Sequence, residues 1–488
     1  MVTPRPMERH EAAGSSGPTN SAADADAWTA FLSDISPLRV DASDAALVDA
    51  STDRAWTVAP VLPRALVRCE SVSDVVRVLR AANLWRIPVV PRGAGTGLSG
   101  GAAAVDGCVV LDLSRMDRIL EIDPVSRTAV VEAGVINKSL DVAVAVHDLA
   151  FAPDPASSAI STVGGNIATN AGGLRCVKYG TTRGSVLAVR VVLADGEVVC
   201  LGGKTRKNAT GLDLLGLIVG SEGSLGVIVE ATVALIPRPW NEQMILACFD
   251  DESALERAAE AVARSRVVPA AFEMMDRESI GVVGERLLRL LDIDRLGAGL
   301  LIVRTDGAGA SAEIEALAAS LSVPGVRPSR RLSAPESELV MQLRRGSGVE
   351  GVGDPQVGSD DRWWLGEDMT LPIRSLARYL RHARSVAASH EVRISHIAHL
   401  GDGNVHPSLT LAKEYGSEED ARTWLQAAAD ELVRFALAEG GALTGEHGVG
   451  LAKLPWIDEA LSLEVREIQR RVKRALDPNG ILNPGKAL

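Results

Sequence analysis

The sequence has few cysteines, less positive than negative charge, and no long apolar run. Its formal net charge of −12 argues against the basic surface that nucleic acid or anionic lipid requires. No apolar stretch reaches the ~18 residues of a membrane-spanning helix, and residues 1–26 contain no apolar signal segment. The cysteines are odd in number and show no CxxC spacing, which argues against a disulfide framework or a cysteine metal site: Cys69, Cys108, Cys176, Cys200 and Cys248.

These shortages predict a cytoplasmic protein without a transmembrane segment, one that can still lie at the periphery of a membrane. The sequence is instead rich in apolar residues, which make up 46% of its 488 residues. A chain of this size buries more than one core, so two or three domains are expected. We expect the partner to be a small molecule rather than a nucleic acid, and a homodimer is compatible with these features.

The pattern of elements predicts three segments. Residues 1–26, rich in Ser, Ala, Gly and Asp, are expected to form a disordered tail. Residues 27–239 combine glycine-rich loops with short strands and two hairpins, and a helix capped by Ser73. The two prolines at 237 and 239 end this segment, and residues 240–488 then alternate strands with helices, as in an α+β domain with helices on one sheet face. Helical periodicity follows over 372–389, 418–438 and 457–476, after shorter helices that include 278–290.

The first glycine-rich loop follows a strand predicted over 87–90 and spans residues 91–101. It contains a GxGxxG pattern at Gly95, Gly97 and Gly100. A dinucleotide-binding fold needs a helix directly after this pattern, but the next strand begins at Cys108 and leaves no room for one. The loop therefore predicts a nest of main-chain N–H groups around the phosphates of a cofactor. The alternative is a glycine-rich surface turn.

Two further glycine-rich loops are predicted. Residues 161–173 read STVGGNIATNAGG, and residues 220–226 read GSEGSLG and lead into an apolar strand over 227–236. Loops with several glycines and short polar side chains allow the backbone to approach a ligand closely. Their presence favours the cofactor interpretation of the first loop over a surface turn.

Histidines gather in the last quarter of the chain. If Asp402-Gly403 forms a two-residue hairpin turn, His399 pairs directly with His406 on one sheet face. Two imidazoles and a carboxylate form a common open metal site, and Glu446 is the natural third ligand. The alternative is a hydrogen-bonded histidine pair with Glu446 in a solvated loop. His396, three residues before His399, points to the other face and is expected to be structural.

Four ordered motifs carry a family resemblance. PRGAGTGLSGG, Pro153-Asp154-Pro155, STVGGNIATNAGG and SEGSLGVI resemble the FAD-binding domain of the vanillyl-alcohol oxidase and p-cresol methylhydroxylase type. The resemblance implies an α+β fold with a two-subdomain FAD-binding module, an α+β cap domain and a C-terminal helical segment that returns to the flavin. The FAD contacts that it implies are Arg92, Gly93, Ala94, Gly95, Thr96, Gly97, Leu98, Pro153, Asp154, Ser158, Thr162, Gly164, Gly165, Thr169, Gly172, Glu222 and Ile228. Because the first loop contains no histidine, we expect the FAD to be bound non-covalently.

The C-terminal motifs HLGDGNVH, GEHGVG and LNPGK resemble D-lactate dehydrogenases, the glycolate oxidase flavin subunit and D-2-hydroxyglutarate dehydrogenases. This resemblance implies a divalent metal, Zn, Mn or Fe, held by His399, His406 and Glu446. It makes His447 the catalytic base, and Asn483 a cofactor-side residue. Arg344 matches an arginine that holds the substrate carboxylate.

The sequence departs from the D-2-hydroxyglutarate branch of that family. Where that branch tends to have a lysine, a hydroxyl residue and an asparagine, this chain has Gly366, Gly348 and Ser408. A substrate with a second, distal carboxylate would therefore lack the side chains that bind this group in that branch. The departures favour lactate, glycolate or another monocarboxylate.

Together the motifs imply FAD-dependent oxidation of a small D-2-hydroxy acid, such as lactate, glycolate or a 2-hydroxyglutarate-like acid. Hydride transfer to the flavin gives the 2-oxo acid, and the sequence leaves the electron acceptor open. One alternative is an alkyl-dihydroxyacetone-phosphate-synthase-like flavoenzyme. The motifs HLGDGNVH and GEHG argue against this alternative. The others are a metal-dependent hydrolase without flavin and a subunit that keeps the fold without turnover.

Overall fold

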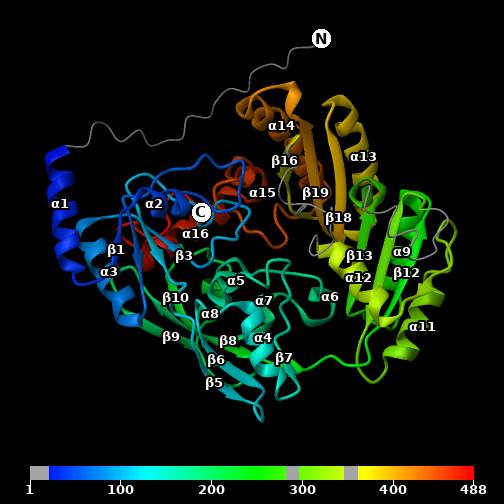
Figure 1. Cartoon of the computed structure of the whole chain (residues 1–488), viewed down its shortest axis with the longest axis horizontal. Coiled ribbons are helices and arrows are strands. Elements are labelled where there is room, and N and C mark those ends of the chain that lie inside the picture. The colour runs from blue at the N-terminus through cyan, green and yellow to red at the C-terminus, as the bar shows by residue number, and fades with distance from the viewer. Residues whose placement is uncertain (1–20, 282–295, 346–360, 488) are drawn as a thin grey trace.

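The computed structural model describes residues 21–281, 296–345 and 361–487. These residues form an α+β protein, with two main sheets and a two-stranded pair in the first half of the chain and one large sheet in the second (Figure 1). The loops of the first half face the large sheet across the middle of the molecule. The two-subdomain module and the α+β cap are thus confirmed as the fold class.

The first sheet has four strands in the order β1-β2-β4-β3. Strands β2, β4 and β3 are parallel. Helix α3 buries the apolar side of an amphipathic pattern, including Val75, Val78 and Leu79. Ser71 caps it by accepting a hydrogen bond from Asp74 N, so the predicted cap at Ser73 is wrong by two residues. The elements are β1 (Val40–Asp41), β2 (Ala65–Arg68), β3 (Val89–Arg92), β4 (Val109–Asp112), α1 (Ser21–Asp34), α2 (Asp44–Ala50) and α3 (Val72–Trp85).

The first described helix begins inside the segment that was expected to be a disordered tail. Helix α1 begins at Ser21, so the prediction of disorder is wrong for residues 21–26. Phe31 and Ile35 at its end are fully buried against the first sheet, which explains why this segment is ordered. Residues 1–20 lie outside the described parts of the chain.

The second sheet is antiparallel, with the order β5-β6-β10-β8-β9. Both predicted hairpins are confirmed, as β5 pairs with β6 and β8 with β9. Residues 161–173 are not all loop, because helix α5 forms within them and Thr162 caps it. The elements are β5 (Ile119–Asp123), β6 (Thr128–Glu132), β8 (Val186–Val192), β9 (Val198–Gly202), β10 (Val227–Ala234), the pair β7 (Leu149–Ala150) and β11 (Ile236–Pro237), and the helices α4 (Asn137–Ala145), α5 (Val163–Thr169), α6 (Cys176–Tyr179), α7 (Thr182–Ser185) and α8 (Leu214–Ile218).

The third sheet has eight strands, seven of them in the order β15-β12-β14-β13-β18-β19-β16, with β17 also paired to β19. Four helices, α9, α11, α13 and α14, pack on one face in the largest buried cluster, as predicted. Helix α12 packs on the opposite face. The elements are β12 (Gln243–Phe249), β13 (Ala271–Asp276), β14 (Gly299–Thr305), β15 (Arg330–Arg331), β16 (Arg362–Gly366), β17 (Met369–Thr370), β18 (Arg393–His399), β19 (Asn404–Ala412), α9 (Glu252–Ala263), α11 (Ala310–Ser320), α12 (Ala334–Arg345), α13 (Leu376–Ser389) and α14 (Glu418–Ala438).

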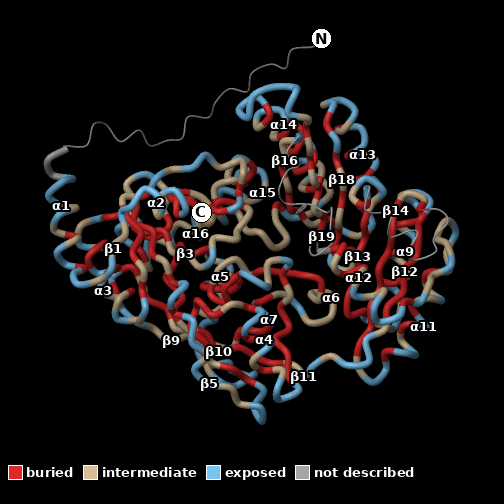
Figure 2. The backbone as a smooth tube through the Cα atoms, viewed as in Figure 1, coloured by how far each residue is buried: buried red, intermediate tan, exposed pale blue. Residues whose placement is uncertain are grey.

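The chain end returns to the first sheet. The predicted helix over 457–476 is two helices, α15 (Ile457–Ala460) and α16 (Leu463–Leu476), because Ser462 caps the second. Leu482 then lies beside Val89 of β3, and the N–H of Asn483 donates to Val89 O. Figure 2 shows buried backbone running through all three sheets. The helix predicted over 278–290 lies mostly outside the described residues, and no helix described is long and apolar enough to cross a membrane.

Candidate functional site

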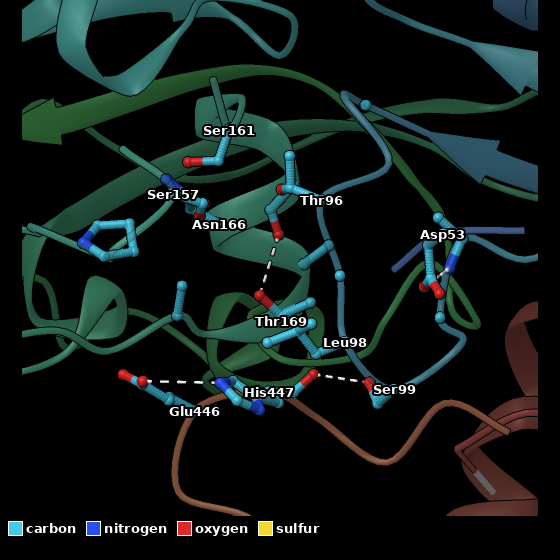
Figure 3. A pocket seen from close by; sticks show the side chains of 18 of the residues that line it. Asp53, Thr96, Leu98, Ser99, Ser157, Ser161, Asn166, Thr169, Glu446 and His447 are labelled. Atoms are coloured by element: carbon cyan, nitrogen blue, oxygen red, sulfur yellow. Dashed lines mark hydrogen bonds and ion pairs between the residues drawn. The ribbon is translucent and has the colours of Figure 1, made fainter. Parts of the chain in front are cut away.

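One cavity runs between the glycine-rich segments and the sheet face that carries α12 (Figure 3). It contains about 1920 Å³ of space free of protein atoms, including its mouth. Four predicted cofactor residues do not line it, namely Pro153, Asp154, Ser158 and Asn483; Pro155, Ala156 and Ser157 do instead. The predicted residues that line it are Arg92, Gly93, Ala94, Gly95, Thr96, Gly97, Leu98, Thr162, Gly164, Gly165, Thr169, Gly172, Glu222, Ile228, Arg344, His399, His406, Glu446 and His447.

The first glycine loop presents its backbone to this cavity. Among the described residues, the N–H groups of residues 94–98 find no hydrogen-bond acceptor. The Arg92 guanidinium donates to the carbonyls of Thr52 and Ala102 and so holds the loop in shape. Asp53, which the sequence did not single out, accepts from Ala102 N, and burial raises the pKa of its carboxyl. Free N–H groups in one loop are the groups that an anion-binding nest would use.

The second glycine segment packs directly against the first. A Cβ at Gly93 would lie 2.3 Å from Thr162 Oγ1, and one at Gly164 would lie 2.6 Å from Ala133 Cβ. Ser161 Oγ and Asn166 Nδ2 border the cavity, are buried, and have no hydrogen-bond partner among the described residues. Buried polar groups are normally satisfied, so these two atoms fit a ligand rich in polar atoms.

Glu222 connects the third glycine segment to the C-terminal loop. Its carboxylate accepts from Val449 N at 2.7 Å and from Gly450 N at 2.8 Å. The Asn483 side chain donates to the carbonyls of Glu222 and Gly101. Glu222 and Asn483 therefore fix the glycine segments to the loop that follows His447.

The histidine hairpin has a different register from the one predicted. His399 pairs with Asn404, and His406 pairs with Ile397, across a four-residue turn closed by a hydrogen bond from Asp402 N to His399 O. The predicted direct pairing of the two histidines is therefore wrong. Because the shift is two residues, both side chains stay on the same face, and their ring centroids are 5.2 Å apart.

His399, His406 and Glu446 together have the geometry of a metal site. Glu446 Oε1 lies 3.6 Å from His399 Nε2 and 3.3 Å from His406 Nε2, and the three ligand atoms all lie within 4.8 Å of one another. Ligands about 2.1 Å from a tetrahedral ion lie about 3.4 Å apart. The three side chains fit a divalent ion, with positions left open for a substrate.

Glu273 on β13 orients His399 and was not predicted. Its Oε1 lies 2.9 Å from His399 Nδ1, and its Oε2 lies 2.6 Å from Arg344 Nη2. Burial opposes protonation of His399, but the Glu273 and Glu446 carboxylates outweigh it and raise the pKa of His399 to about 10. A carboxylate on the second nitrogen of a metal-binding histidine fixes the ring. The available signal was an acidic residue in the middle of the otherwise apolar run of residues 271–275.

Arg344 lies in the cavity, where a substrate carboxylate was expected to meet it. Its guanidinium is buried and already paired with Glu273, and Nη2 lies 3.4 Å from His399 Nδ1. The positive charge of Arg344 is thus partly compensated within the protein.

Asp368, also not predicted, holds the loop of Glu446 and His447. One carboxylate oxygen, Oδ2, accepts from the main-chain N–H groups of Gly445, Glu446 and His447, and from Thr444 Oγ1. Burial opposes ionisation, but neighbouring positive charges and these donors keep the pKa of Asp368 below its usual range. The loop conformation therefore depends on one ionised, fully buried carboxylate.

His447 lies between the metal ligands and the first glycine loop. Its ring stacks on His406 at 5.3 Å, and its Nε2 lies 3.8 Å from Glu446 Oε1. Its carbonyl accepts a hydrogen bond from Ser99 Oγ at 2.8 Å (Figure 3). Burial lowers the pKa of His447, which favours the neutral form of the ring that can accept a proton. His396 points away from this group, as predicted, and its Nδ1 lies 2.9 Å from Asp276.

A glycine-rich loop with free main-chain N–H groups that faces histidines and carboxylates across one cavity is typical of a cofactor-dependent oxidoreductase. Residues 63–202 match a family model described as an FAD binding domain, and residues 238–487 match one described as FAD linked oxidases, C-terminal domain. The chain belongs to this family of FAD-linked oxidases. The free N–H groups of the first loop and the unpartnered Ser161 and Asn166 fit FAD as the ligand.

Individual proteins agree with this assignment. The chain is 33% identical to the glycolate oxidase subunit GlcD of Bacillus subtilis over 430 residues, which cover 87% of this chain and 89% of that protein. It is 35% identical to a D-lactate dehydrogenase of Archaeoglobus fulgidus, over 88% of this chain and 93% of that protein. The fold is similar to that of 4-ethylphenol oxidase from Gulosibacter chungangensis, with a TM-score of 0.75 at 21% identity, over 97% of this chain and 98% of that one.

Proposed function

We propose that this protein oxidises a small D-2-hydroxy acid to the 2-oxo acid, with FAD as hydride acceptor and a divalent metal that binds the acid. One observation carries the proposal: a single cavity is lined by the glycine nest, by the three metal-ligand candidates and by His447. Relatives named as a glycolate oxidase subunit and as a D-lactate dehydrogenase support the substrate class.

Each group has a role in this proposal. Bound FAD supplies the acceptor for the hydrogen at C2 of the acid. His399, His406 and Glu446 would hold the divalent ion, Zn, Mn or Fe, which supplies chelation of a carboxylate and an adjacent hydroxyl. Neutral His447 accepts the hydroxyl proton at Nε2, and Arg344 is the candidate for orienting the carboxylate.

The FAD is proposed to be bound non-covalently, because residues 91–101 contain no histidine. Denatured and precipitated protein should then release all of its yellow cofactor into the supernatant. Yellow colour that stays with the precipitate would contradict this.

Anaerobic mixing with D- and L-2-hydroxy acids tests the reaction class. We expect D-lactate or D-glycerate-sized acids to bleach the flavin absorbance at a rate that saturates with concentration, and their L-isomers to bleach it at least ~10-fold more slowly. If no 2-hydroxy acid bleaches the flavin of the metal-loaded protein, the proposed function is wrong.

His447→Ala tests the proposed base. Because general-base catalysis contributes about 10²–10⁴-fold, flavin bleaching should slow by about that factor while the bound flavin keeps its spectrum. The exposed His147 provides the matched control, and His147→Ala should bleach at the wild-type rate. Equal rates in both variants would remove His447 from the base role.

The alternative functions fit the site less well. A metal-dependent hydrolase without flavin leaves the glycine nest without a ligand, whereas the first half of the chain matches an FAD binding domain. An alkyl-dihydroxyacetone-phosphate-synthase-like reaction involves no net redox change and gives the metal-ligand candidates no role. The cytoplasmic location and the homodimer stay predictions, and the electron acceptor stays open.

A further inference from the structure

A tryptophan, a glycine and a serine lie next to the metal-ligand candidates on the same sheet face. Strands β16 and β19 pair so that Gly366 is opposite Ser408, and Trp364 is opposite Thr410. Ser408 lies two residues after His406 and therefore shares its face. Trp364, Gly366 and Ser408 all line the cavity beside His406.

The Trp364 indole occupies the space that a side chain at position 366 would need. A Cβ at Gly366 would lie 2.4 Å from Trp364 Cζ2 and 2.5 Å from its Cη2. Trp364 also lies close to Leu98 and His447, since all three border a small adjoining pocket. The indole is thus held between the first glycine loop and the sheet, beside the proposed base.

This end of the cavity offers an acid no free positive charge among the described residues. The cationic side chains that line the cavity are Arg92 and Arg344. Arg92 donates to main-chain carbonyls of the first loop, and Arg344 is paired with Glu273. Beside Gly366, the carboxylate of Glu367 is bonded to the buried Lys453 at 2.9 Å. A second carboxylate bound here would be desolvated without a partner.

We propose that Trp364 determines which 2-hydroxy acid is oxidised, by packing its indole against the side chain of the acid, that is, C3 and any atoms beyond it. The site then selects monocarboxylic acids with an apolar side chain and rejects those with a second carboxylate. Gly366 is a positioning residue in this scheme, because its lack of a side chain lets the indole lie against the strand. This inference rests on the proposed function and adds the substrate side chain to it.

The wild-type protein is tested first with a series of D-acids. We expect kcat/KM for D-lactate and D-2-hydroxybutyrate to exceed that for D-malate and D-2-hydroxyglutarate by about 100-fold or more. The dissociation constants of the matching 2-oxo acids, measured from changes in the flavin spectrum, should show the same order. A dicarboxylate that is as good a substrate as D-lactate would overturn the inference but leave the proposed function intact.

Two variants test the residue itself. Trp364→Ala should raise kcat/KM for D-2-hydroxyisocaproate relative to D-lactate by about 10-fold, because removal of the indole opens space for a branched side chain. The change should appear mainly in KM. Gly366→Ala, whose Cβ would displace the indole, should alter the ranking of acids while the tryptophan is still present.

Trp363→Ala is the matched control. Trp363 precedes Trp364 in β16 and so points to the opposite face, where it stacks on Trp56 at 6.0 Å. The Trp363→Ala protein should be less stable than the wild type but should keep the wild-type ranking of acids. An unchanged ranking in both Trp364→Ala and Gly366→Ala would overturn the inference, as would the same change of ranking in Trp363→Ala. Absence of flavin bleaching by every acid in the wild type would overturn the proposed function, and this inference with it.

Discussion

The two walls of the cavity recognise their ligands with different kinds of chemical group. On the glycine-rich wall, main-chain N–H groups of residues 94–98 and small side chains face the cavity. On the sheet wall, buried and half-buried ionisable side chains face the cavity and lie close to one another, as His399 does to Glu273. Ligand binding at the glycine-rich wall depends on the absence of side chains, whereas ligand binding at the sheet wall depends on pairs of charged side chains.

This difference predicts opposite responses to substitution. An added methyl group on the glycine wall, away from the place where it meets the sheet wall, should displace the backbone and remove the cofactor, while the sheet wall should remain able to bind metal. Removal of a charge from the sheet wall should weaken metal binding, while FAD remains bound. The three predictions below test this separation, in order of decreasing effect.

Gly164→Ala should have the largest effect. The new Cβ would lie 2.6 Å from Ala133 Cβ and 2.8 Å from the Ala133 carbonyl oxygen, so α5 must move. Overpacking of this kind costs about 1–3 kcal/mol, and the FAD content per chain, measured by absorbance, should fall to a tenth or less. Gly203→Ala is the control, because nothing lies within 4 Å of its Cβ. A yellow Gly164→Ala protein with full FAD content would refute the close-packed cradle.

Glu273→Gln should have the next largest effect, on the metal. Loss of the carboxylate that orients a metal-binding histidine typically lowers metal affinity by about 10–100-fold. Titration with Zn²⁺ or Mn²⁺ should show this decrease at unchanged FAD content. Glu230→Gln, which removes a half-exposed partner of Arg190 in the second sheet, should leave metal affinity unchanged. Equal affinities in the wild type and Glu273→Gln would show that Glu273 does not position His399.

Gly172→Ala should have the smallest effect and tests where the two walls meet. A Cβ at position 172 would lie 2.4 Å from Glu446 Oε2. Gly172, on the glycine-rich wall, therefore leaves room for Glu446, a metal-ligand candidate on the sheet wall. The carboxylate can rotate and Glu446 Cβ, at 3.0 Å, needs only a small shift, so we expect metal affinity to fall by only about 3–10-fold with FAD retained. Loss of FAD instead of metal would assign Gly172 to the cofactor cradle alone.

The sequence predicted best what depends on local residue type. Alternating apolar residues with a turn dipeptide predicted the hairpins β5–β6 and β8–β9, and clustered glycines predicted the nest. The same clustering hid α5, because glycines disfavour helices in isolation. This helix is stabilised by the Thr162 cap and by the burial of Val163 and Ile167 in the core.

The sequence did not reveal what depends on distant pairing. Glu273 meets His399 only because β13 and β18 are neighbours in the sheet, although the two residues are 126 positions apart. Asp368 reaches Glu446 in the C-terminal loop across a gap of 78 positions. The predicted register of the histidine hairpin was wrong because the turn contains four residues rather than two. A shift of two residues nevertheless keeps His399 and His406 on the same face, so both still lie beside Glu446.

The most direct test of the account is the rate of anaerobic flavin reduction by D-lactate in metal-loaded and metal-free protein at equal FAD content. If the metal held on the sheet wall presents the acid to the flavin on the other wall, removal of the metal by a chelator should slow reduction by about 100-fold. Restoring the metal should restore the rate. Equal rates with and without metal would contradict the claim that the two walls act on one substrate.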